Sequence, residues 1–137
     1  MAPWPESGEW IGAIDQELLR FRRDLHHQFL LGGIAARAVR IEHAGRAAGY
    51  AYISAQGHVG PLAIAPDADA KAVVTTALRC ALEGGAKQVS MIVPGRADVV
   101  MQTALALGFR IEEPLVLMAW RPFGNWCNYL PRTPGFL

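Results

Sequence analysis

The stretch from His58 to Val74, HVGPLAIAPDADAKAVV, constrains the fold more than any other part of the chain. Its first nine residues are almost entirely apolar, which is typical of a strand buried on both faces. A proline-containing turn follows, and apolar residues then recur at helical spacing as far as Leu82. We therefore predict a buried strand over 58–66 that passes directly into a helix over 67–84.

The segments on either side of this unit predict the rest of the sheet. ARAVRIEH (36–43) and AAGYAYISA (47–55) alternate between apolar and other residues around a short turn, which indicates an antiparallel hairpin. Apolar runs at 87–95 and 109–120 predict two later strands, and a helical pattern at 96–108 lies between them. Because helices connect these later strands, we expect an α/β (α+β) domain with a mixed sheet, antiparallel in its first half and parallel in its second, flanked by about three helices.

A long amphipathic helix is predicted before the hairpin, from Ser7 to the glycine pair at 32–33. Its apolar stripe has spacings of three and four and consists of Ile11, Ile14, Leu18, Phe21, Leu25 and Phe29. The opposite face carries Arg20, Arg22, Arg23, Asp24, His26 and His27. We interpret that face as solvated, and a ligand or partner surface is the alternative.

Composition limits the class of protein. A chain of 137 residues that is 52% hydrophobic predicts one domain, with residues 1–7 as an extension and the aromatic, proline-rich residues 121–137 as a tail. A net charge of +1 provides no basic face for nucleic acid. No apolar run reaches the roughly 20 residues of a membrane span. The two cysteines imply no disulfide framework, and no Cys/His cluster has metal-ligand spacing, so we expect a soluble cytoplasmic protein without a metal or a membrane partner.

The order of the motifs resembles the GCN5-related N-acetyltransferases (GNAT). The run GYAYIS…GHVGPLAIAPD is followed by a helix and strand ending EGGAKQVSMIVPG, and then by a helix ending ALGFR. The resemblance covers about residues 18–137 and is greatest to the C-terminal half of tandem GNAT proteins. It implies a sheet with a V-shaped gap beside the central strand, where acetyl-CoA binds as if it were another strand.

The resemblance also implies which residues would bind acetyl-CoA. The backbone of Leu62, Ala63 and Ile64 would pair with the pantetheine arm. The pyrophosphate would meet the amides at the start of the following helix, where unpaired N–H groups and the helix dipole favour an anion. The residues at that helix start are Asp69, Ala70, Lys71, Ala72, Val73 and Val74.

This helix start departs from the pattern [Q/R]-x-x-G-x-[G/A] that is typical of the family. Asp69 stands at the Gln or Arg position, and Ala72 and Val74 stand at the two small-residue positions. A carboxylate would repel a diphosphate, whereas Lys71 would offset part of that repulsion. Asp67 or Asp69 has a purely structural interpretation as well, since aspartate is a preferred helix cap.

Catalytic candidates are few. The family often has a tyrosine acid four residues before the GF motif, and that position is Ala104 here. His58 is the candidate base or water-holding residue, because an imidazole titrates near neutral pH. Tyr52 is the candidate donor to the departing thiolate. The structural alternatives are a surface histidine and a core tyrosine.

Two functions follow from the resemblance. The first is an acetyl-CoA-dependent N-acetyltransferase that acts on a small amine or peptide amine by direct transfer. The second is a GNAT-fold binding or dimerisation module without that activity. We also predict a homodimer in which the aromatic tail contributes to the contact, because an open sheet edge is normally covered.

Overall fold

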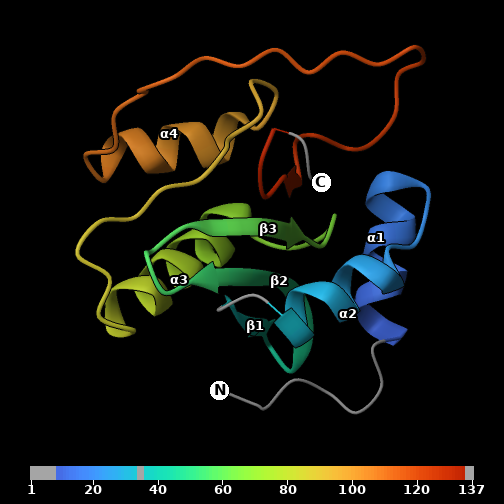
Figure 1. Ribbon diagram of the computed structural model, residues 1–137, viewed down its shortest axis with the longest axis horizontal. Coiled ribbons are helices and arrows are strands. Elements are labelled where there is room, and N and C mark those ends of the chain that lie inside the picture. Colours follow the sequence, from blue (N-terminus) through green and yellow to red (C-terminus); the bar gives the residue numbers. More distant parts are fainter. Residues whose placement is uncertain (1–8, 34–35, 135–137) are drawn as a thin grey trace.

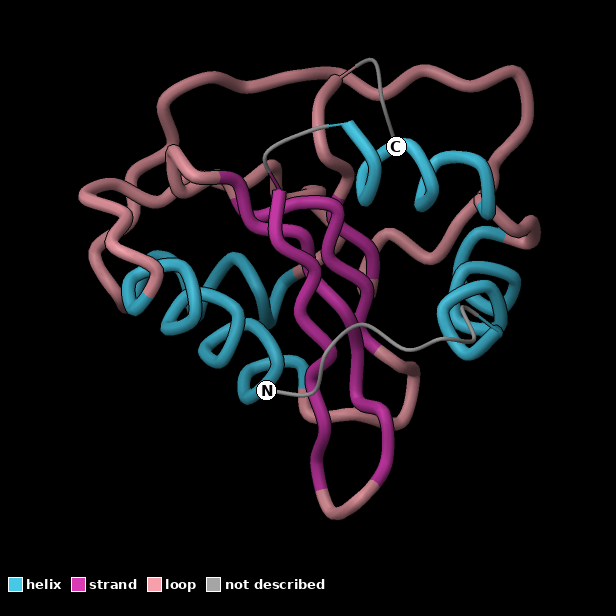
Figure 2. The backbone as a smooth tube through the Cα atoms, turned by 60° about the horizontal axis from the view of Figure 1, so that its bottom comes forward, coloured by secondary structure: helices cyan, strands magenta, loops and turns pink. Residues whose placement is uncertain are grey.

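The computed structural model describes residues 9–33 and 36–134. They form one sheet with helices on both of its sides (Figures 1 and 2). The sheet has the order β1-β2-β3-β4, and each neighbouring pair is antiparallel. The strands are β1 (Ala36–His43), β2 (Arg46–Ser54), β3 (Val59–Ile64) and β4 (Tyr129–Leu130). The helices are α1 (Glu9–Leu19), α2 (Asp24–Gly33), α3 (Ala70–Glu83) and α4 (Asp98–Ala106).

The predicted hairpin and the predicted strand–turn–helix are confirmed. Ala44 and Gly45 both have positive φ, 52° and 75°, which matches the twist that two-residue hairpin turns require. All six residues of β3 are buried, as expected for a central strand. The α+β class therefore holds, with an antiparallel sheet.

The two later strands are not found in the structure. Among the described residues, no strand covers 87–95 or 109–120, and a single parallel bridge joins His58 to Ser90. Beyond that bridge, the edge of β3 that faces away from β2 pairs with β4, which is formed by residues of the C-terminal tail. The C-terminal residues therefore form the edge strand next to β3, in the place where we predicted a parallel strand.

The prediction of one long N-terminal helix was wrong, because the structure has two helices there. α1 ends at Leu19, Arg20 has a φ of 70°, and α2 begins at Asp24. The four residues between them change the helical register, so the stripe does not continue into α2. Leu25 and Phe29 are 78% and 56% exposed as a result.

The same break buries part of the face that we interpreted as solvated. Arg23 and His27 are 3% and 6% exposed, whereas Arg20, Arg22 and Asp24 are exposed as expected. The solvated-face interpretation was thus wrong for Arg23 and His27.

The sheet separates two hydrophobic clusters. On one face, Val39, Ile53 and Leu62 lie in a cluster with side chains of α3 and α4. On the other face, Tyr50 and Tyr52 lie in a cluster with α1 and with Leu30 of α2. In the part of the chain that the structure describes, no helix is both long and apolar enough to cross a bilayer. The predicted extension over residues 1–7 lies outside the described residues.

Candidate functional site

The edge of β3 that faces away from β2 is the centre of the candidate site, and residues 128–130 pair with it. Leu62 pairs with Leu130, and Ala63 pairs with Tyr129. The Ile64 amide donates to the Asn128 carbonyl at 2.8 Å, and Asn128 Nδ2 donates to the Ile64 carbonyl at 3.2 Å. The backbone positions that the GNAT resemblance assigns to pantetheine are therefore paired with the chain's own tail.

Further contacts fix the tail at both ends of β4. After β4, Arg132 Nη1 donates to the Gly60 carbonyl at 3.2 Å. A Cβ at Gly60 would lie 2.9 Å from the Pro131 carbonyl oxygen, so the tail approaches here because glycine has no side chain. Before β4, the Asn125 amide donates to the Leu18 carbonyl at 2.6 Å. The tail is therefore bonded to α1 and along β3 of the same chain.

This placement bears on the predicted dimer. Tyr129 and Leu130 are both fully buried against β3. A dimer contact built from these two side chains would require them to leave that position. The homodimer itself remains a prediction.

The His58 side chain contacts two segments that are distant from it in the sequence, one at Ser90 and one in the tail. Its Nδ1 accepts from the Ser90 hydroxyl at 3.0 Å, and its Nε2 donates to the Arg132 carbonyl at 2.6 Å. Burial lowers the pKa of His58, although the Arg132 carbonyl opposes that shift. A neutral imidazole whose two nitrogens are both bonded joins β3 to the tail, and taking a proton from a substrate would require it to lose the Ser90 bond.

Tyr52 is part of the core, which was the structural alternative for this residue. Its ring is fully buried, and its hydroxyl lies 2.8 Å from His27 Nδ1. Burial raises the pKa of Tyr52. Tyr52 and His58 form their polar contacts with different groups, so the structure does not unite them in one catalytic arrangement.

The start of α3 is capped from within the chain. Asp69 Oδ1 accepts from the Ala72 amide at 3.2 Å, and the Asp69 carbonyl accepts from the Val73 amide at 3.0 Å. The capping interpretation of Asp69 is confirmed. Of the other residues predicted there, Lys71 is exposed, Ala70 is half-buried, and Val73 and Val74 are buried in the core. Two of the amides that a pyrophosphate would need are thus already bonded, and the Val74 side chain points into the core.

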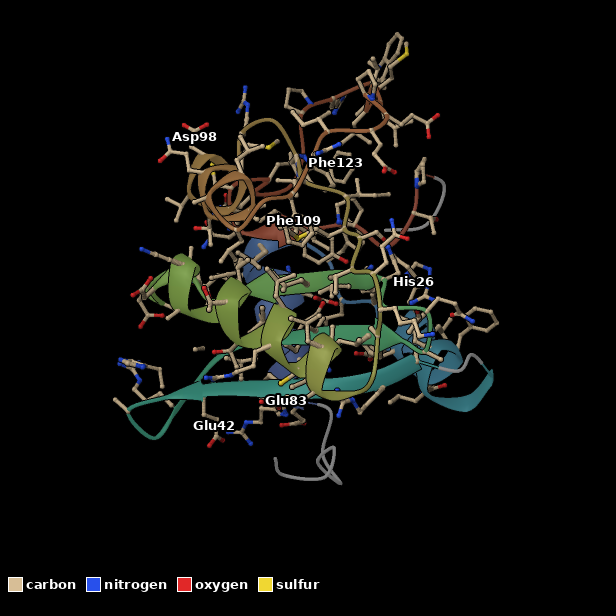
Figure 3. All side chains as sticks on the ribbon, turned by 90° about the vertical axis from the view of Figure 1, so that its left-hand side faces the viewer. His26, Glu42, Glu83, Asp98, Phe109 and Phe123 are labelled. Atoms are coloured by element: carbon tan, nitrogen blue, oxygen red, sulfur yellow. The ribbon has the colours of Figure 1, made fainter. Side chains whose placement is uncertain are left out.

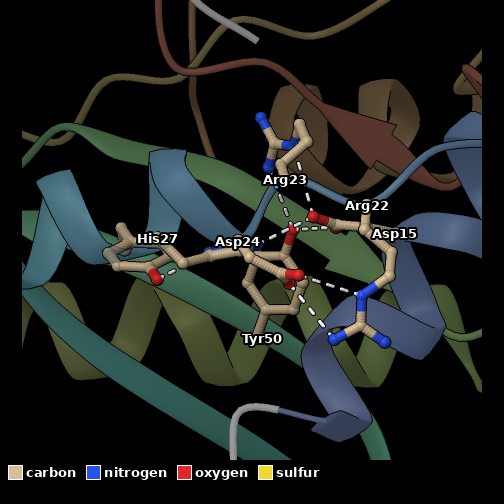
Figure 4. Close-up of polar contacts among 7 residues, drawn as sticks. Asp15, Arg22, Arg23, Asp24, His27 and Tyr50 are labelled. Carbon is tan, nitrogen blue, oxygen red and sulfur yellow. Dashed lines mark hydrogen bonds and ion pairs between the residues drawn. The ribbon is translucent and has the colours of Figure 1, made fainter.

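Sequence reasoning missed a buried polar cluster on the other face of the sheet, drawn in part in Figure 4. We call it the Asp15 cluster, and its members are Asp15, Arg23, His27, Tyr50, Tyr52 and Tyr129. Asp15 is fully buried and accepts from Arg23 Nε at 3.2 Å, from His27 Nε2 at 2.7 Å and from the Tyr50 hydroxyl. Arg23 also donates to the Tyr50 hydroxyl at 3.2 Å and lies 4.9 Å from the centre of the Tyr129 ring.

The electrostatics of the cluster favour an ionised Asp15. Burial alone would raise the pKa of this carboxyl group, but the His27 hydrogen bond, the Arg23 charge and the Tyr50 hydrogen bond outweigh burial and lower it. Burial raises the pKa of Tyr50 well above its ordinary value. The cluster is therefore a carboxylate held by a guanidinium, an imidazole and a neutral phenol, and it joins α1, α2, β2 and β4.

One sequence signal for this cluster existed. Asp15 is a charged residue in the middle of a helix, directly beside the apolar position Ile14. Tyr50 and Tyr52 are two residues apart in a predicted strand and so share one face of it, and the structure places Tyr50 against Asp15 and Tyr52 against His27. Its partners Arg23 and His27 were hidden by the assumption of one continuous helix.

Comparisons with known proteins identify no relative of this chain. No family model, no curated protein and no solved structure matches it. Within the described ranges, no group of three or more His, Cys, Asp or Glu side chains could hold a metal ion.

Proposed function

We propose that this chain is a GNAT-like interaction module whose β3 edge holds an extended polypeptide segment instead of acetyl-CoA, and that it does not transfer acetyl groups. One observation carries the proposal: residues 128–130 pair with the edge formed by Leu62, Ala63 and Ile64. Main-chain hydrogen bonds from an added strand are a general way for a sheet edge to bind a peptide segment. In this structure the segment is the chain's own tail.

Three further observations support the loss of transfer chemistry. Asp69 uses the Ala72 amide and adds a negative charge where the pyrophosphate would bind. The position of the family's tyrosine acid is Ala104, which is buried. His58, the remaining candidate base, uses both ring nitrogens to hold Ser90 and the tail.

The GNAT-like architecture belongs to this proposal as well. The parallel bridge between His58 and Ser90 supports it, because a parallel half of the sheet would begin at such a bridge. The acetyltransferase alternative, with a small amine or peptide amine as acceptor, remains a prediction. It requires residues 128–130 to leave the edge of β3 before the thioester arm can bind.

The test is a calorimetric titration of the intact protein with acetyl-CoA. We expect no binding heat up to millimolar ligand, because the tail occupies the edge and the helix start repels the diphosphate. The matched variant is Asp69→Asn, which removes the charge while keeping a good helix cap. We expect it to be equally silent, since the tail is still in place. Micromolar binding by the intact protein, or transfer of the acetyl group to an amine, would contradict the proposal.

A further inference from the structure

The segment 111–121 crosses the molecule as an extended loop (Figure 1, orange). Its apolar side chains are exposed. Its exposure alternates along the chain. Val116, Met118 and Trp120 are 86%, 85% and 96% exposed, whereas Leu115 and Leu117 are 49% and 54% exposed. A period of two is typical of a strand with one face turned fully outward. The described part of this chain leaves that face uncovered.

Both ends of the segment are anchored. Phe109 packs against the cluster formed by the sheet, α3 and α4. The Phe123 ring lies 5.3 Å from the Trp126 ring and 6.4 Å from the Phe21 ring, measured between centroids. Phe109 and Phe123, which precede and follow the segment in the sequence, are labelled in Figure 3. An extended segment that is fixed at both ends has already lost part of the conformational freedom that binding would cost.

The two ends of the segment carry opposite charges, so a second copy of the segment that runs antiparallel to it would have complementary charges. Glu113 and Arg121 are exposed and lie on either side of the apolar stretch. Neither takes part in any ion pair among the described residues. An antiparallel copy would bring the acidic end of one segment to the basic end of the other.

We propose that segment 111–121 pairs with the same segment of a second copy of this chain, antiparallel and centred on Leu117. In this register Glu113 faces Arg121 of the second copy, and Val116 faces Met118. If the two Leu117 residues form a hydrogen-bonded pair, Pro114 falls in a non-hydrogen-bonded pair, where its missing N–H is not needed. The opposite charges and the apolar pairs both favour this alignment.

This inference does not depend on the proposed function, and it moves the predicted dimer contact from the tail to the segment before it. A single pair of strands buries less than the roughly 1,200 Å² that separates standard from weak interfaces. We therefore expect a dimer that dissociates in the micromolar range. It brings the outward apolar side chains of the two copies side by side, and it does not displace Tyr129 or Leu130.

A charge exchange tests the pairing. Glu113→Arg places two arginines opposite each other at both ends of the pair, and we expect it to weaken the dimer about tenfold or more in sedimentation equilibrium. Glu113→Arg combined with Arg121→Glu restores the opposite charges and should recover most of the affinity. Glu83→Arg, on the exposed end of α3, is the matched control and should leave the dimer unchanged.

Oxidative cross-linking tests the register in a Cys127→Ser background. Leu117→Cys should form a covalent dimer, because the two residues face each other, and Glu112→Cys should not, because its copies lie at opposite ends of the pair. A protein that is monomeric at several hundred micromolar would overturn the proposal. So would a dimer that the charge exchange does not weaken, or one in which Leu117→Cys does not cross-link.

Discussion

Asp15→Ala is expected to lower the free energy of unfolding by about 3–5 kcal/mol, because it leaves buried charge without its partner. Arg23 and His27 lose the carboxylate that accepts their hydrogen bonds, and the Tyr50 hydroxyl loses its acceptor. None of these groups can reach water without opening the contact between α1, α2 and the sheet. Urea unfolding followed by far-UV circular dichroism measures the effect.

The control for this prediction is Glu83→Gln, which removes an exposed carboxylate 4.0 Å from Arg79. We expect a change of less than about 0.5 kcal/mol, since exposed ion pairs contribute little. A loss as small as this in Asp15→Ala would show that the Asp15 cluster does not hold the helices to the sheet.

The pH dependence of the two proteins gives a second readout of the same carboxylate. The pKa of Asp15 is lowered from 3.8 in the folded state, so its contribution is present above the unfolded value and is lost as the pH falls through the folded value. The stability advantage of the unmodified protein over Asp15→Ala should therefore shrink as the pH falls below about 4. Equal acid sensitivity of the two proteins would contradict an ionised Asp15.

Tyr129→Ala is expected to cost about 3–5 kcal/mol, as truncation of a buried aromatic side chain usually does. The ring is fully buried, lies beneath the Arg23 guanidinium and contacts the Trp126 ring at 6.0 Å between centroids. Its removal therefore opens a cavity where β4 meets the Asp15 cluster. The same urea titration measures this loss.

Tyr129→Phe separates the ring from its hydroxyl. The hydroxyl is buried and forms no hydrogen bond of ordinary geometry among the described residues, although it interacts with the Tyr50 hydroxyl, so its removal should change the stability by less than about 1 kcal/mol. A loss in Tyr129→Phe as large as that in Tyr129→Ala would show that the hydroxyl has a partner and that packing of the ring is not the main contribution. A negligible loss in both would contradict a buried β4.

Local signals in the sequence predict the elements that are fixed locally. The hairpin follows from alternation and its turn, and α3 follows from helical periodicity and the Asp69 cap. The break at 20–23 could not be predicted in this way, because apolar residues continue at helical spacing across it. What ends α1 there is a change of backbone conformation at Arg20, and the burial of Arg23 and His27 beside Asp15 accompanies it.

The candidate site was only partly within reach of the sequence. The β3 edge and the start of α3 could be located, because a buried strand leading into a capped helix has a clear pattern. The occupant of that edge could not, since β4 is two residues long and lies 65 or more residues along the chain from β3. A strand this short has no periodicity, and only the long-range contacts of Asn128, Tyr129 and Leu130 define it.

The central claim is that the tail occupies the edge of β3, and a nuclear Overhauser experiment on the intact protein tests it most directly. Ala63 and Tyr129 form a non-hydrogen-bonded antiparallel pair, because the neighbouring Ile64 amide bonds to Asn128. Their Cα atoms should therefore be about 4.5 Å apart, close enough for a strong contact between the two Hα protons. We expect this signal in the free protein and its persistence in excess acetyl-CoA. Its absence from the free protein would show that the tail does not pair with β3, and its loss when acetyl-CoA is added would show that the ligand displaces the tail.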